Sequence, residues 1–119
     1  MSRIAGGLLM AAILLLTACQ GAAGGGAVAN QTQDPNFVIG AGLYKRHCSG
    51  CHGESGEGRT SLGPALNEPD WQASVTDNDI RTVILEGRRV AGTSMEGYRE
   101  VLSDDEVAAV IVYIRALDD

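Results

Sequence analysis

The sequence predicts an all-α fold in which three main helices and the loops between them form one small domain. Three segments carry apolar residues at helical spacing, and two of them begin with a helix-capping signature. Glycine and proline are concentrated between these segments, and no segment shows the alternation of apolar and polar residues that is typical of a strand. The 119 residues are enough for a single domain.

The first predicted helix covers residues 37–47, with the sequence FVIGAGLYKRH. Gly40 leaves room on this helix for the backbone of another segment to approach closely. Four apolar side chains are expected to share the face that this helix buries: Phe37, Ile39, Leu43 and Tyr44.

The second and third helices begin with capping boxes, in which a Thr or Ser is followed three residues later by an acidic residue. Thr76 and Asp79 form the first box, and this helix ends before Gly87, a residue type that commonly follows a helix. Ser103 and Glu106 form the second box. The apolar stripes consist of Ile80, Val83, Ile84 and Leu85 in the second helix, and of Val107, Val110, Ile111, Ile114 and Leu117 in the third.

The rest of the domain is expected to be loop. A series of turn-forming residues excludes a long helix after residue 52. They are Gly53, Gly56, Gly58, Gly63 and Pro64. Residues 92–97 are bounded by glycines and predict a second loop before the last helix.

The first 18 residues have the form of a bacterial secretion signal, with the basic Arg3, an apolar run to Leu16 and small residues after it. The apolar run is shorter than the about 20 residues that a membrane span needs. The letters LTAC at residues 16–19 resemble the lipobox of bacterial lipoproteins, which implies cleavage before Cys19 and acylation of that cysteine. The alternative is an ordinary signal peptide with a chance cysteine.

The next segment, residues 19–36, is small, polar and rich in glycine, and it predicts a flexible linker to a folded domain at residues 37–119. The whole chain has 9 basic and 15 acidic side chains, which give a formal net charge of −6. No basic run suits the phosphates of nucleic acid, which argues against that class of partner. Charged partners are expected to present positive patches to this acidic protein.

Cys48, Cys51 and His52 form the pattern C-x-x-C-H, which is the attachment sequence of a c-type haem. Two thiols three residues apart on a tight turn can form thioethers with the vinyl groups of the porphyrin, and His52 can then bind the iron. A zinc site is a weaker interpretation, because it needs four ligands and the only other cysteine is Cys19. A thioredoxin-like dithiol would need a strand before it, and none is predicted.

Met95 is the only methionine after the predicted signal peptide, and it lies in the segment GTSMEGY before the last helix. Because no apolar periodicity accounts for it, its thioether is predicted to be the second axial ligand of the iron, an arrangement that raises the reduction potential. An iron without this sixth ligand is the alternative. His47 is the other conceivable donor, but it is badly placed beside the attached turn and is expected to face solvent.

From about residue 37 to residue 116 the chain resembles a class I cytochrome c of the small bacterial kind. The matching pieces are GAGLYKRHCSGCHG, GPAL, a capped helix and TSMEGYREVLSDDEVAAVIVYIRAL, in that order. The resemblance implies that the first and last helices cross near the haem, with Gly40 packed against Val110. It also implies that the rings of Tyr44 and Tyr113 fill this crossing.

The resemblance assigns two more residues to the haem site. The carbonyl of Pro64 would accept a hydrogen bond from the second ring nitrogen of His52 and so raise its basicity; the alternative is a simple turn proline. Trp71 would donate its indole N–H to a haem propionate, or else pack in the core. Family members often have proline after the ligand methionine, and Glu96 in this place makes the loop less rigid.

The predicted function is electron transfer by one covalent haem c, whose iron alternates between ferrous and ferric states. Electron transfer binds no substrate, so the protein is expected not to be an enzyme, and its partners are a redox donor and a redox acceptor. It is expected to be a monomer on the outer side of a bacterial membrane, in the periplasm, anchored by lipid on Cys19. The alternatives are a haem subunit docked to a larger oxidase or dehydrogenase, and a five-coordinate haem protein that reacts with gases or peroxide.

Overall fold

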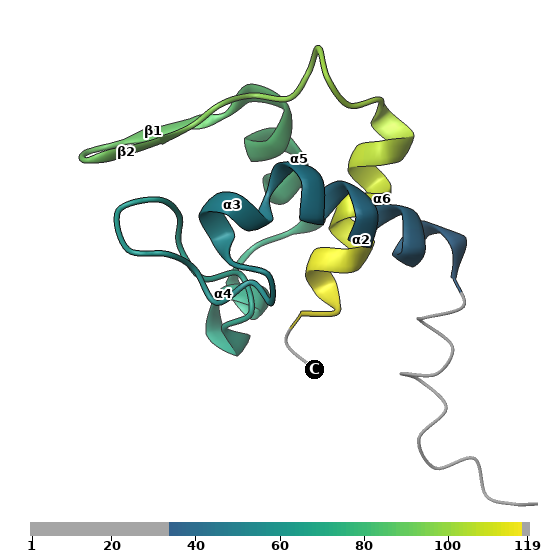
Figure 1. The fold of residues 1–119 in the computed structure, drawn as a ribbon, viewed down its shortest axis with the longest axis horizontal. Coiled ribbons are helices and arrows are strands. Elements are labelled where there is room, and N and C mark those ends of the chain that lie inside the picture. Colours follow the sequence, from purple (N-terminus) through teal and green to yellow (C-terminus); the bar gives the residue numbers. More distant parts are fainter. Residues whose placement is uncertain (1–33, 118–119) are drawn as a thin grey trace, which may run out of the picture.

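The computed structural model describes residues 34–117, so the predicted signal peptide, Cys19 and nearly all of the predicted linker lie outside the described residues. The described part is mostly helical and contains one small antiparallel hairpin (Figure 1). Its elements are α2 (Pro35–His47), α3 (Ser49–His52), α4 (Pro69–Ser74), α5 (Asp77–Glu86), β1 (Arg88–Val90), β2 (Thr93–Met95) and α6 (Asp104–Arg115). Within these residues, no helix has both the length and the apolar character that crossing a membrane requires.

The three predicted helices are present with the predicted caps. Helix α5 begins after Thr76 and α6 begins after Ser103, and each carries a complete capping box in which the cap side chain and the acidic side chain exchange hydrogen bonds with the backbone. Helix α2 begins two residues before the predicted start, because Asp34 caps it by accepting a hydrogen bond from the Asn36 N–H and Pro35 occupies the first turn.

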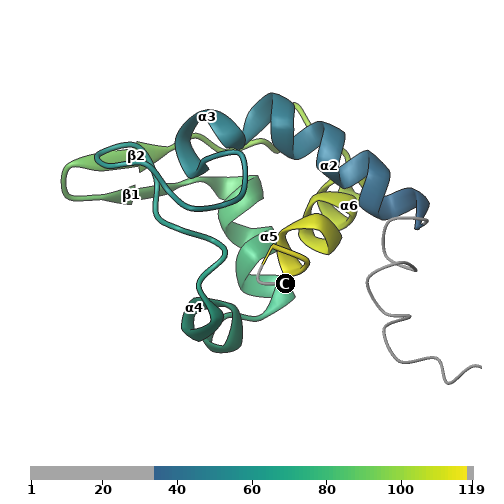
Figure 2. The same ribbon diagram turned by 60° about the horizontal axis from the view of Figure 1, so that its bottom comes forward.

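Helices α2 and α6 cross in close contact, as both views show (Figures 1 and 2). The prediction that Gly40 permits this approach is confirmed, but its partner is the backbone carbonyl of Ala109 rather than Val110. Val110 is the next residue along α6 and is fully buried in the core. The predicted pair of tyrosines does fill the crossing, since the ring centroids of Tyr44 and Tyr113 are 5.1 Å apart.

The core lies between α2, α5 and α6. The buried apolar cluster comprises Leu43, Tyr44, Leu66, Ile80, Ile84, Leu102, Val107, Val110, Ile111 and Ile114. The expected face of α2 is only partly correct, because Ile39 is 49% exposed. Phe37 is half-buried and packs its ring against Tyr113, with 5.3 Å between the centroids.

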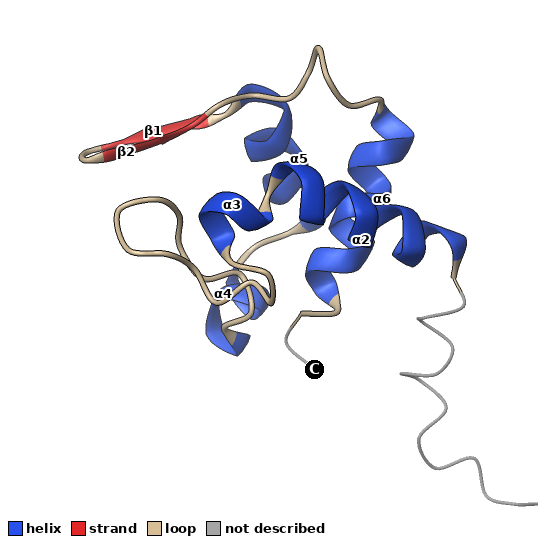
Figure 3. Cartoon of the chain, in the orientation of Figure 1, coloured by secondary structure: helices blue, strands red, loops and turns tan. Residues whose placement is uncertain are grey.

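The hairpin corrects the prediction that this domain contains no strand. Strand β1 pairs with β2 in antiparallel register, with Arg88 opposite Met95 and Val90 opposite Thr93 (Figure 3, red). Each strand has three residues, which is too short to show a recognisable alternation of polar and apolar residues. The segment predicted as a loop at residues 92–97 therefore contains β2, and this strand ends at Met95, the residue predicted to bind iron.

Helix α4 was also not predicted, and long-range polar contacts hold it in place. The buried side chain of Gln72 donates to the carbonyls of Leu66, at 2.7 Å, and Ile114, at 2.8 Å. Arg115 donates in turn to the backbone and side-chain oxygens of Gln72 and pairs with Asp77. These contacts fasten α4, and the chain that leads to it, to the C-terminal end of α6.

Candidate haem site

The C-x-x-C-H segment forms a single helical turn directly after α2. Helix α3 spans Ser49–His52, and the amides of Cys51 and His52 both donate to the carbonyl of Cys48, at 3.1 and 3.0 Å. Residues three apart in a helical turn project to the same side, so Cys48 and Cys51 can engage one flat ligand together. Cys51 is exposed and Cys48 is partly buried, and burial raises the pKa of the free Cys48 thiol to about 11.

The His52 ring is held in one orientation. It is 8% exposed, and its Nδ1 lies 2.9 Å from the carbonyl oxygen of Pro64, which is the hydrogen bond that the family resemblance implies. A carbonyl oxygen can only accept, so Nδ1 carries the hydrogen and Nε2 keeps its lone pair for a metal. The backbone of Gly63 packs closely against the ring, since a Cβ at this position would lie 3.1 Å from Cε1 of His52.

The chain after His52 is folded back tightly onto the turn. Gly53 has a φ of +85°, and its carbonyl accepts a buried hydrogen bond of 2.9 Å from the hydroxyl of Tyr44. The amide of Gly58 donates to the carbonyl of His52 at 2.6 Å. Backbone hydrogen bonds to the carboxylate of Glu57 lower its pKa, so this side chain stays ionised and fixes the turn at residues 53–57.

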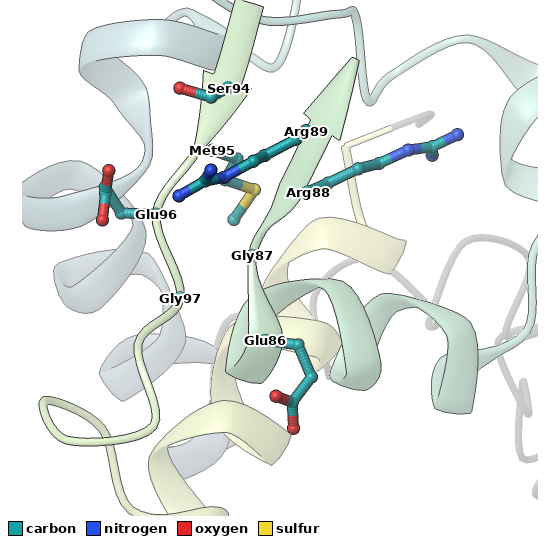
Figure 4. A pocket seen from close by; sticks show the side chains of 8 residues that line it. All are labelled: Glu86, Gly87, Arg88, Arg89, Ser94, Met95, Glu96 and Gly97. Carbon is teal, nitrogen blue, oxygen red and sulfur yellow. The ribbon is translucent and has the colours of Figure 1, made fainter.

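Met95 is the last residue of β2, and its half-buried side chain packs against the edge of the core. It lines a polar hollow of about 240 Å³ between the C-terminal end of α5 and the hairpin. Figure 4 shows its thioether between the two strands, with Glu96 turned to the other side of β2. The hollow is bounded by Glu86, Gly87, Arg88, Arg89, Ser94, Met95, Glu96 and Gly97. It includes no residue of α3, so the hollow itself is not the haem cradle.

Two hydrogen bonds join the Met95 segment to the chain on either side of the C-x-x-C-H segment. Thr93 donates from its hydroxyl to the carbonyl of Leu62 at 3.2 Å, which brings the hairpin beside the loop that follows α3. Tyr98 donates from its hydroxyl to the carbonyl of His47 at 2.9 Å. Sequence reasoning missed both links, because donor and acceptor lie 31 and 51 residues apart and no local pattern records such a pairing.

Two further sequence expectations have different outcomes. His47 was expected to face solvent, but it is half-buried and meets the Tyr98 ring edge-on, with 5.7 Å between the centroids. The structure therefore gives this histidine a packing contact. Trp71 lies on α4, partly buried against the core cluster. Its expected hydrogen bond to a propionate stays a prediction.

The residues present suit a covalently held haem. The turn offers two thiols that form no disulfide, beside an imidazole whose Nε2 is free to bind iron. Within residues 34–117, no set of three or more His, Cys, Asp or Glu side chains is arranged to hold a metal ion, whereas zinc would require four protein ligands in a structural site. Together with the mostly helical fold, this site is that of a small cytochrome c.

Comparison with known proteins identifies the family. The family model described as cytochrome c oxidase, cbb3-type, subunit III matches residues 35–114. The chain belongs to this cytochrome c family, and its cofactor is haem c with its iron.

Three relatives illustrate the match. Cytochrome c-L of Methylorubrum extorquens is 38% identical over 80 residues, which are 66% of this chain and 38% of the relative. The cbb3-type cytochrome c oxidase subunit FixP of Sinorhizobium medicae is 27% identical over 93 residues, which are 73% of this chain and 32% of the relative. The solved structure of the KustC0563 c-type cytochrome has a TM-score of 0.59 and 27% identity, over 67% of this chain and 98% of that one. The chain thus spans well under half the length of these two curated relatives.

Proposed function

We propose that this protein carries one electron at a time on a haem c that is bound through Cys48 and Cys51, with His52 and Met95 as the axial ligands of iron. The observation that supports this proposal most is the geometry of α3, where a single turn presents both thiols and an imidazole held by Pro64. Bound haem c supplies an iron that takes up and releases one electron. The protein supplies the ligands and holds them in place.

The residues around His52 are proposed to set its properties as a ligand. The hydrogen bond from Nδ1 to the Pro64 carbonyl fixes the ring and makes Nε2 more basic, as outer hydrogen bonds do for metal-binding histidines. Gly63 lets the backbone lie against the ring. Because the ring cannot turn, little reorganisation of this ligand is needed when the charge of the metal changes.

Met95 and Trp71 are proposed to complete the site. Met95 is the only methionine among the described residues, and the hairpin places it at the edge of the core cluster that Cys48 also contacts. A thioether ligand favours the reduced metal and raises the reduction potential. Trp71 lies against the same cluster, and its indole N–H is proposed to donate to a propionate.

Absorption spectra of the oxidised protein test the ligand assignment. A weak band near the red edge of the visible spectrum reports a bond between ferric iron and methionine sulfur, and we expect it in the wild type. Met95→Ala should abolish the band while the haem content stays unchanged. His47→Ala is the matched control and should keep the band. A wild-type protein without the band that binds carbon monoxide readily would contradict the proposal in favour of a five-coordinate haem.

We also propose that the domain works on the outer side of a bacterial membrane, in the periplasm, as a monomer tethered through an acylated Cys19. The lipobox-like letters at residues 16–19 and the glycine-rich segment after them support this proposal. A tether confines the domain near membrane-bound donors and acceptors and so raises its effective concentration. Cys19→Ser should move the protein from the membrane fraction to the soluble fraction, and equal partition of variant and wild type would contradict the tether.

A second candidate is a haem subunit that stays docked to a larger complex. The description of the matching family as an oxidase subunit favours it, as does the relative named as an oxidase subunit. The electron chemistry would be the same, but one partner would be permanent. Purification in mild detergent distinguishes the candidates: a docked subunit co-purifies with a membrane complex in fixed ratio, whereas a carrier separates from it.

A further inference from the structure

We propose that Tyr98 is a positioning residue that holds Met95 in register with the haem-binding turn, through the hydrogen bond from its hydroxyl to the carbonyl of His47. This inference rests on the proposed function, in which Met95 and His52 bind the same iron. It assigns to Tyr98 a role in keeping the two ligand-bearing segments together, in addition to its part in the core.

The acceptor of this bond is at the boundary of the haem-binding turn. His47 is the last residue of α2, where backbone carbonyls have no partner within the helix, and Cys48 follows it directly. The hydroxyl of Tyr98 lies 2.9 Å from this carbonyl, in a partly buried position. The bond therefore holds the residue directly before the C-x-x-C-H segment to Tyr98, which is only three residues beyond Met95.

The main chain of Tyr98 is itself anchored. Its amide donates to the carbonyl of Ile84 at 2.8 Å, and its carbonyl accepts from the amides of Val101 and Leu102, each at 2.9 Å. Gly97 lies against the backbone of α5, so that a Cβ there would collide with the carbonyl of Leu85. The backbone of Tyr98 is thus fixed against α5, and its side chain extends from there to the last residue of α2.

Neither of the two residues between Met95 and Tyr98 links this segment to the haem-binding turn through a side chain, although the backbone of the segment packs closely on Gly87 and the end of α5. Glu96 is exposed and carries no ring that would fix its backbone angle, and Gly97 has no side chain. The other link between the hairpin and the haem-binding loop is the bond from Thr93 to Leu62, which is exposed and longer, at 3.2 Å. A bond open to water is easily exchanged for a bond to solvent, so the half-buried Tyr98 bond is the stronger restraint.

Removing only the hydroxyl should loosen the Met95 segment without disturbing the core. Tyr98→Phe keeps the ring and hence its edge-on contact with His47. Tyr44→Phe is a matched control, because Tyr44 also donates a 2.9 Å hydrogen bond from its hydroxyl to the haem-binding segment, at Gly53. Tyr44 lies on α2 and packs on Tyr113, away from the segment between Met95 and Tyr98. Both variants lose one hydroxyl bond, but only Tyr98→Phe loses the link to the Met95 segment.

The experiment is titration of the oxidised holoprotein with imidazole, followed by loss of the iron–sulfur band. Imidazole competes with Met95, so its apparent affinity reports how readily Met95 leaves. We expect Tyr98→Phe to bind imidazole roughly two- to tenfold more tightly than the wild type, the factor that one neutral hydrogen bond is worth. Tyr44→Phe should stay within about twofold of the wild type, even if its resistance to denaturant falls.

Each outcome separates this inference from the proposed function. A wild type without the iron–sulfur band overturns both. A wild type with the band, but with Tyr98→Phe and wild type equal in imidazole affinity, overturns the role of Tyr98 alone. An equal increase in the imidazole affinity of Tyr98→Phe and Tyr44→Phe also overturns the role of Tyr98, because the loss of either hydroxyl would then loosen the whole site.

Hydrogen exchange of the wild-type holoprotein gives a second test that does not depend on a variant folding. The Tyr98 amide should exchange as slowly as amides in the middle of α5. Exchange as fast as that of an exposed loop would contradict the anchored position of Tyr98.

Discussion

Helix α2 contains two glycines, Gly40 on the face that is buried against α6 and Gly42 on an exposed face. They allow a direct test of the helix crossing on which the fold depends. An ideal Cβ at Gly40 would collide with the backbone carbonyl of Ala109 on α6 and would lie 3.1 Å from Cβ of Tyr113. An ideal Cβ at Gly42, two residues later, meets nothing within 4 Å. The two alanine substitutions are chemically identical, so any difference between them reports the packing against α6.

The two substitutions are expected to change the free energy of unfolding in opposite directions. Alanine in a helix interior is favoured over glycine by about 1 kcal/mol, so Gly42→Ala should stabilise the protein by up to that amount. Gly40→Ala gains the same term but must separate α2 from a backbone carbonyl that cannot rotate away. Overpacking of this kind costs about 1–3 kcal/mol, and contact with backbone favours the upper end. The net loss should be about 2 kcal/mol, which places the two variants about 3 kcal/mol apart.

Urea unfolding of the purified holoproteins, followed by circular dichroism in the far ultraviolet, measures this difference. Both variants should unfold in one transition with the slope of the wild type, so that the shift in midpoint converts directly to free energy. If Gly40→Ala proves as stable as Gly42→Ala, the close approach of α2 to α6 is wrong and with it the argument for glycine at position 40.

Two more predictions concern long-range and electrostatic contacts. Gln72→Leu should reduce the free energy of unfolding by about 3 kcal/mol, because the buried carbonyls of Leu66 and Ile114 lose their donor; a loss below about 1 kcal/mol would show that these carbonyls find other partners. Hydrogen bonds from the backbone and side chain of Ser103 lower the pKa of Glu106 in the folded protein. Its contribution is therefore complete above the unfolded pKa of about 4.3 and disappears as the pH falls through the lower folded value. Glu106→Gln should flatten the loss of stability on acidification below about pH 4, measured by urea midpoints across the pH range, whereas parallel curves for variant and wild type would contradict this assignment.

Local signals account for what the sequence predicted correctly. The capping boxes at Thr76 and Ser103 and the pattern at Cys48, Cys51 and His52 each lie within a few consecutive residues, so propensity and hydrogen bonding act without help from the rest of the chain.

Contacts distant in sequence account for what was missed. The burial of Ile39 depends on which part of α2 the helix α6 covers. The sequence of α2 alone does not determine this. His47 gains its packing contact only because the chain returns at Tyr98. Helix α4 is held by Gln72 through a carbonyl of α6, 42 residues away. The hairpin at residues 88–95 is stabilised by pairing across a turn and is too short to show periodicity.

Peptide mass spectrometry of the mature protein tests most directly whether the turn at residues 48–52 carries haem covalently. Trypsin should cleave after Arg46 and Arg59, so that Cys48 and Cys51 leave on one peptide, residues 47–59. We expect this peptide to carry the mass of one haem after extraction with acidified acetone, and we expect neither cysteine to react with an alkylating reagent. Recovery of the peptide with two alkylated cysteines, and of the pigment in the acetone, would contradict the account.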